Sequence, residues 1–303
     1  MRLPSVPNPL STWPVDLLRE RSSRALFELV AGPGGDQAQQ RIHATPGPRW
    51  FEDGSPIRRV HGDTSMYVGG VRALLLQMLH PLAMAAVADF SDFRGDPWGR
   101  LARTSTFLAE TTFGAADDAE RAVRIVRAVH RKVQGTAPDG RPYRADDPHL
   151  LTWVHVAEVD SFLSAHQTFG ARPLSETEAD EYITQAGEVA LRLGAKDVPG
   201  SQAELAATLD RYRPELAVTP AAREASRFLL LQAPVPLLAR GPYGVLVSAA
   251  VGALPGWARA ELGLGALHLL DSSVGRVGGH VAVRGLRWIS PTAPVPEPVP
   301  VLH

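Results

Sequence analysis

Apolar residues recur at helical spacing along most of this chain, so the pattern predicts a mainly helical protein. We expect a first helix over 15–30, ended by the glycines and proline at 32–35. The polar stretch that follows, up to about Gly62, is typical of a loop. A long apolar helix is then expected over about 65–89. It should break at His80-Pro81, because proline lacks a backbone donor and crowds the preceding turn.

Start and stop signals place the elements of the second half of the chain. Ser175 is followed three residues later by Glu178, which is a capping box, and Ser201 and Glu204 repeat the pattern. Residues 279–289 alternate weakly and favour a short strand or an extended tail. After a polar turn near 92–99, the predicted helices cover about 100–113, 117–134 with Asp117 and Asp118 as caps, 148–169, 175–193, a segment after Ser201 and a segment from about Pro220.

These elements predict an all-α fold, because no run of alternating strands is present. The predicted organisation is one helical domain over 15–290, between irregular proline-rich tails at 1–14 and 291–303. The apolar stretch 228–257 contains Arg240 and four prolines, which argues against a membrane span and for buried helices or a lid over an apolar cavity.

Composition narrows the classes of function. The formal net charge over 303 residues is −1, with no basic half, which argues against nucleic acid as a partner. The chain has no cysteine, so thiolate ligands and thiol nucleophiles are excluded. The first residues lack the apolar core of a signal peptide, so we expect a cytoplasmic protein without a transmembrane span. Peripheral contact with a membrane and the oligomeric state stay open.

Two histidines lie on predicted apolar helix faces. His130 shares its face with Val126 and Val133, and His155 falls on the same face as Val159. A histidine in such a stripe is either a core residue with hydrogen-bonded ring nitrogens or a metal or haem ligand. His80, beside Pro81, is a third candidate, with the alternative of a helix C-terminal histidine that interacts favourably with the helix dipole.

The segment DPWGRLARTSTFL contributes polar candidates. Arg100 and Thr104 are one helical turn apart, and Arg103 lies on the adjoining face. They are either solvent-facing residues at a helix start or a guanidinium and a hydroxyl at the mouth of a pocket, where they would bind a propionate or steer dioxygen. A metal-dependent hydrolase or oxygenase using histidine with Asp63, Asp89 or Asp160 is the least favoured alternative, because no pair of these residues has one-turn ligand spacing on one helix.

Several ordered segments together carry a family resemblance: QMLHP, DPWGRLARTSTFL, VHRKVQG, YRADDPHLLTWVH and PLSETEADEY. In this order they resemble the oxygenase domain shared by bacterial rubber oxygenases (latex clearing proteins) and fungal MpaB-type oxygenases. The resemblance covers about 62–209, roughly half of the chain. It implies a globin-like helical core that holds one haem b, and relatives that use dioxygen to cleave carbon–carbon double bonds of polyisoprenoids.

The resemblance also assigns residues. The family's proximal histidine best matches His130, with His155 as the main competitor, and its distal arginine and threonine match Arg100 and Thr104. Where the latex clearing protein has a lysine that reaches the iron, this chain has Arg103, which stays protonated and is a poor ligand.

The sequence therefore predicts a haem b-dependent oxygenase that acts with dioxygen on an apolar, isoprenoid or lipid-like alkene. A haem-binding sensor without turnover and a haem-free helical protein that binds an apolar ligand remain the alternatives.

Overall fold

The structure is a computed structural model that describes residues 14–91, 94–264 and 273–289. The described chain is mainly helical, which confirms the predicted all-α class, and its strands form one small hairpin. The predicted tails lie outside the described residues, except for Pro14, which begins α1. The elements of the first half are α1 Pro14–Ala31, α2 Gly35–Ala44, α3 Pro56–His61, α4 Met66–Gln77, α5 Pro81–Phe90, α6 Pro97–Phe113, α7 Ala116–His130, β1 Gln134–Thr136 and β2 Pro142–Arg144.

The second half is built around a long buried helix, α8, which spans 22 residues and buries more than half of them. The elements of this half are α8 Pro148–Phe169, α9 Glu176–Leu193, α10 Gln202–Tyr212, the 3-10 turn η1 Arg213–Glu215, α11 Pro220–Arg227, the π-helical turn η2 Phe228–Gln232, the 3-10 turn η3 Leu237–Ala239, α12 Arg240–Ala253, α13 Gly256–Glu261 and α14 Ser273–Ile289.

The pair α4 and α8 forms the centre of the molecule. Gly69 permits their close approach, since a Cβ there would lie 2.7 Å from the ring of Phe162. Arg72 of α4 is 3% exposed and joins three helices. It pairs with Asp160 of α8 at 2.7 Å, donates to Ser161 at 2.7 Å and donates to the carbonyl of Ala253 in α12 at 2.9 Å. Buried charge is satisfied in this way by a partner and by hydrogen bonds.

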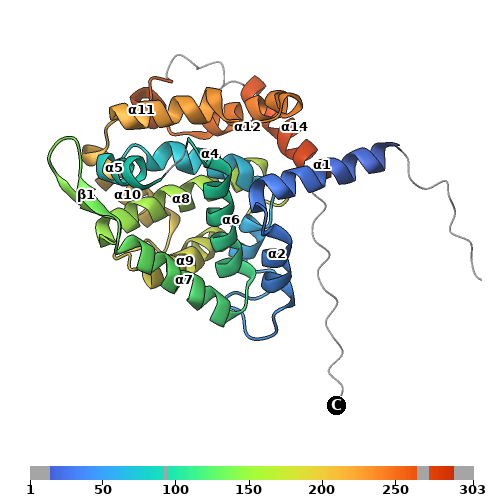
Figure 1. Cartoon of the computed structure of the whole chain (residues 1–303), viewed down its shortest axis with the longest axis horizontal. Helices are drawn as coiled ribbons and strands as arrows, with labels where there is room; N and C mark the ends of the chain where they lie inside the picture. The colour runs from blue at the N-terminus through green and yellow to red at the C-terminus, as the bar shows by residue number, and fades with distance from the viewer. Residues whose placement is uncertain (1–13, 92–93, 265–272, 290–303) are drawn as a thin grey trace, which may run out of the picture.

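Other helices pack around this pair (Figure 1). Helices α11, α12 and α14 lie over α4 and α5, whereas α7 and α9 lie on the opposite side of α8. Helix α6 stands between α7 and the N-terminal helices α1 and α2, and it contacts all three. The β1–β2 hairpin extends beside α5.

The predicted break at Pro81 is confirmed. α4 ends at Gln77, α5 begins at Pro81, and the two helices are bent by 106°. No described helix is by itself long and apolar enough to cross a membrane; only this bent pair passes a test of length and composition. The capping box of Ser175 and Glu178 is also present at the start of α9.

Several local predictions are wrong. The segment predicted as loop up to Gly62 contains α2 and α3, which gain their stability from packing on α6 and α9 rather than from a long apolar stripe. Ala115, not Asp117 or Asp118, is the N-cap of α7, and the two aspartates lie in its first turn. That helix also ends at His130, because Gln134 already pairs in the hairpin.

The predicted strand or tail at 279–289 is instead part of α14. Glycines at 278, 279 and 285 lower the helix propensity of this segment and weaken the apolar periodicity that would predict a helix. Gly279 has a packing reason, since a Cβ there would lie 2.6 Å from Phe169 and 3.0 Å from Ala249. The small residues thus permit α14 to pack closely on α8 and α12.

Candidate functional site

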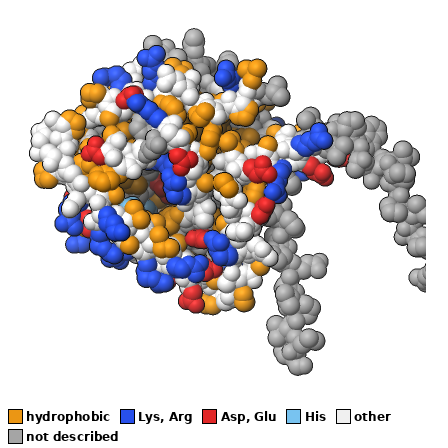
Figure 2. All heavy atoms as spheres, viewed as in Figure 1, with side chains coloured by type: hydrophobic (Ala, Val, Ile, Leu, Met, Phe, Trp, Pro, Cys, Tyr) orange, Lys and Arg blue, Asp and Glu red, His pale blue; other side chains and the backbone are white. Residues whose placement is uncertain are grey.

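His155 and Glu158 lie one turn apart on the same face of α8, the central helix. Burial lowers the pKa of His155 to about 4 and raises the pKa of Glu158 to about 7. Both residues nevertheless keep some surface that water can reach. Strong desolvation together with partial access of water is typical of side chains in a recess, and Figure 2 shows a hollow on one face of the molecule. The Nε2 atom of His155 is buried and has no hydrogen-bond partner.

Beside α8, a histidine that the sequence reasoning missed joins three helices. His61, at the end of α3, holds Thr112 of α6 at 2.8 Å through Nδ1, and its Nε2 lies 3.4 Å from the hydroxyl of Tyr182 in α9. Burial, and then the nearby His166, lower its pKa to about 3. His61 was overlooked because it ends a stretch that was predicted as loop. Glu158 was also missed, although its place three residues after His155 puts both side chains on one helix face.

His130 is the last residue of α7 and is half-buried. Its Nδ1 atom is buried and lacks a hydrogen-bond partner. Burial lowers the pKa of His130, and the charge of Asp146 opposes this shift. The imidazole is therefore neutral at physiological pH, which is the form that can bind a metal.

The three polar candidates of α6 differ in exposure. Arg100 is half-buried and donates to Ser91 Oγ at 2.6 Å; burial and then the charge of Arg103 lower its pKa. Arg103 is 72% exposed and pairs with Asp96 at 3.1 Å. Thr104 is exposed, and its hydroxyl donates to the carbonyl of Arg100 at 3.1 Å.

His80 joins a different group of residues. It is the N-cap of α5, not a helix C-terminal residue, and it is 1% exposed. Burial lowers its pKa, against the opposing charge of Glu215. The structure brings it together with His149 of α8 and Glu215 of η1, so that one ligand atom from each lies within 4.8 Å of the others. The sequence alone does not indicate this convergence, because the three residues lie on separate elements.

The three aspartates considered as ligands of a metal-dependent enzyme each bind another side chain. Asp63 accepts from Arg287 at 3.0 Å, Asp89 accepts from the hydroxyl of Tyr143, and Asp160 pairs with Arg72. None of them belongs to a group of metal-ligand side chains among the described residues.

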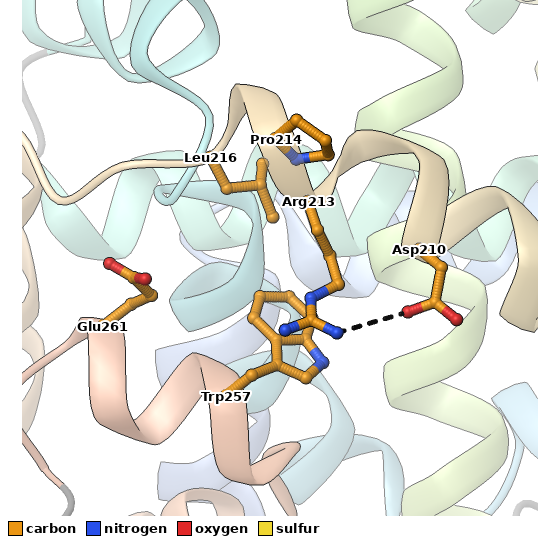
Figure 3. A pocket seen from close by; sticks show the side chains of 6 residues that line it. All are labelled: Asp210, Arg213, Pro214, Leu216, Trp257 and Glu261. Atoms are coloured by element: carbon orange, nitrogen blue, oxygen red, sulfur yellow. Dashed lines mark ion pairs between the residues drawn. The ribbon is translucent and has the colours of Figure 1, made fainter.

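Two surface grooves also occur, and none of the predicted site residues lines either. The first has about 420 Å³ and is lined by six residues, with the guanidinium of Arg213 over the ring of Trp257 at 5.4 Å and paired with Asp210 at 3.7 Å (Figure 3). The second has about 470 Å³, and four arginines line it: Arg124, Arg127, Arg131 and Arg192. Both are too charged to suit an apolar ligand.

The side chains fit a haem iron in two respects. His130 and His155 each offer a neutral imidazole with a buried ring nitrogen that no protein group satisfies. Such orphaned nitrogens are rare in folded proteins and fit an absent ligand. Because the chain has no cysteine, a thiolate ligand is excluded, and imidazole is the expected axial ligand.

Comparison with known proteins adds the family. The model of the family described as ER-bound oxygenase mpaB/B'/Rubber oxygenase, catalytic domain, matches residues 58–288, which extends the resemblance beyond 62–209 to nearly the end of α14. Searches of the curated proteins and of the solved structures find no match. The family match covers most of the chain and agrees with the helical fold, so the chain belongs to the mpaB/rubber oxygenase catalytic-domain family and is an oxygenase.

Proposed function

We propose that this oxygenase depends on haem b and uses dioxygen to oxidise or cleave an apolar, isoprenoid or lipid-like alkene. The observation that carries the proposal is the pair of desolvated, neutral imidazoles, His130 and His155, each with an orphaned buried nitrogen, in an oxygenase domain. The family membership supports the oxygenase chemistry, and the imidazoles support the kind of cofactor.

In this proposal His130 would hold the haem iron, and His155 is the alternative ligand. When bound, haem supplies the redox chemistry that activates dioxygen. The protein keeps the ligand imidazole neutral by burial, so no proton has to leave before coordination. Glu158, with a pKa of about 7, supplies a carboxyl group beside His155 that exchanges a proton near neutral pH.

Arg100 is proposed to stabilise the negative charge that develops on dioxygen as it oxidises the alkene. One of its N–H groups donates to Ser91, and a guanidinium has four more. A half-buried, fixed cation interacts more strongly with such charge than a solvated one. Arg103 and Thr104 lie nearer to solvent and are proposed to line the mouth of the site.

The apolar segment 228–254 is proposed to cover the access route of the substrate. Trp98 Nε1 donates to the carbonyl of Pro234 at 3.3 Å, so this segment lies against the first turn of α6. Leu231 and Leu237 in the same segment are 78% and 75% exposed. Exposed leucines in this segment favour contact with an apolar substrate, or with the surface of a membrane that contains it.

The absorbance spectrum of the purified full-length protein, supplied with haemin, tests the cofactor and its ligand. We expect a Soret band in the wild type and in the control His43→Ala, which alters an exposed histidine of α2. The band should be lost or shifted in His130→Gly and should return on adding free imidazole, which a structural role alone would not produce. Loss in His155→Ala with retention in His130→Gly would assign the ligand to His155. A wild type that gains no Soret band would refute haem dependence.

Oxygen uptake with a panel of isoprenoid and unsaturated lipids tests turnover. Arg100→Gln should lower uptake by about 100-fold, the usual effect of removing one stabilising donor. A haem spectrum without uptake on any alkene would favour the sensor alternative. A colourless protein that binds apolar probes would favour the haem-free alternative.

A further inference from the structure

Three side chains of metal-ligand type converge at a point that the proposed haem site does not use. His80 lies between α4 and α5, His149 in the first turn of α8 and Glu215 in η1. The Nε2 atom of His149 lies 2.9 Å from Glu215 Oε2, and the Nε2 atom of His80 lies 3.5 Å from the same oxygen. Bonds of about 2.05 Å in a tetrahedral zinc site separate neighbouring ligand atoms by about 3.3 Å. Both separations are thus already close to those of a metal site.

His80 supplies a second, independent observation. It is 1% exposed, yet neither of its ring nitrogens has a hydrogen-bond partner. The rings of His149, Trp153 and Tyr212 surround it with centroids 6.1 to 6.4 Å away. A buried imidazole without partners is costly, and the Nε2 side that faces Glu215 is where a ligand would satisfy it.

His149 is held in a suitable orientation by Tyr212. The tyrosine hydroxyl donates to the carbonyl of His149 at 2.8 Å, and it lies 3.3 Å from His149 Nδ1. Without a metal ion, Nε2 of His149 donates to the Glu215 carboxylate, whose two oxygens lie 3.0 and 2.9 Å away. Metal binding requires the other tautomer of His149, in which Nδ1 donates to the Tyr212 hydroxyl oxygen and the lone pair of Nε2 binds the ion. A hydrogen bond to the remote nitrogen is the usual way in which proteins orient a metal-binding histidine.

We propose that His80, His149 and Glu215 bind a divalent late first-row metal ion, with Zn²⁺ as the expected ion. Two imidazole nitrogens and one carboxylate oxygen form a donor set that suits Zn²⁺. The side chains of His149 and Glu215 are 52% and 40% exposed, so the ion has access from solvent and keeps a position for water. The ion joins three distant segments and stabilises the packing of α5, η1 and the start of α8.

Calorimetric titration of the full-length, chelator-treated protein with ZnCl₂ tests the site. We expect one Zn²⁺ per chain and a melting temperature that rises by several degrees on binding. The accessible ligands are changed first, because His80 is in the core: His149→Ala and Glu215→Gln should each weaken binding by more than 10-fold. Tyr212→Phe should weaken it by about 10-fold through loss of orientation. The matched control Glu188→Gln, an exposed carboxylate of α9, should bind as the wild type does.

The proposal fails if Zn²⁺ does not bind with one-to-one saturation, or if His149→Ala and Glu215→Gln bind it as tightly as the wild type while circular dichroism shows them folded. His130→Ala separates this site from the proposed haem site. It should keep the Zn²⁺ affinity of the wild type, and loss of Zn²⁺ binding in that folded variant would contradict the assignment.

Discussion

Replacing Glu158 by glutamine should make the stability of the protein less dependent on pH. Burial raises the pKa of this carboxyl group from 4.5 to about 7. Between these values the folded protein retains a proton that the unfolded chain has released, so the free energy of unfolding falls as pH rises. The stabilisation is complete below pH 4.5 and is lost by the time the pH has passed 7.

The size of the effect follows from the shift. Each pH unit over which the two states differ by one proton is worth about 1.4 kcal/mol, which gives about 3 kcal/mol over the full window. Partial access of water to the side chain reduces this, and we expect about 2 kcal/mol between about pH 5 and about pH 8.5. Glutamine has nearly the same shape and does not titrate. Between the lower and the higher pH, the free energy of unfolding of the variant should therefore rise by about 2 kcal/mol relative to that of the wild type.

Urea unfolding followed by circular dichroism at both pH values measures the difference. The two proteins share every other titrating group. The difference between their free energies of unfolding therefore changes with pH only because of Glu158. The control Glu188→Gln, in which the carboxylate is exposed, should show no such change. If Glu158→Gln and the wild type differ by the same free energy at both pH values, Glu158 is not desolvated, and the inference of a recess at α8 loses its main support.

Two further substitutions test the packing of α4 on α8. Gly69→Ala should lower the free energy of unfolding by about 1–3 kcal/mol, because the new methyl group would overlap Phe162. The control Gly70→Ala, where a Cβ would meet no atom within 4 Å, should be neutral or slightly stabilising. Equal effects of the two in urea unfolding would contradict the close approach. Arg72→Ala should cost about 3–5 kcal/mol, since it removes the partner of the partly buried Asp160. A loss below about 1 kcal/mol would show that water replaces the guanidinium.

Helix identity was largely predictable along the chain. Apolar periodicity located α1, α4 and α8, proline at 81 located the bend, and Ser175 with Glu178 located the start of α9. These signals are local, because a helix satisfies its hydrogen bonds within a few residues and its caps lie beside them. The ordered motifs likewise indicate the family from the sequence alone, and the family match confirms it.

The elements that depend on their neighbours were not predictable. α14 contains glycines that permit close packing and weaken its helical pattern, and α2 and α3 are too short to form without the helices on which they pack. The hairpin ends α7 earlier than periodicity indicated. In each case the stabilising contacts come from residues far away in the chain, which a local pattern does not contain.

The same distinction holds for chemistry. The spacing of residues placed His130 and His155 on apolar faces, because a helix fixes which residues share a face. It could not show that Glu158 is desolvated, since a pKa depends on everything packed around the group. Nor could it bring His80, His149 and Glu215 together, because the angle and register at which helices pack are set by side chains throughout the core. Periodicity determines the faces of helices, and only tertiary packing determines which faces meet.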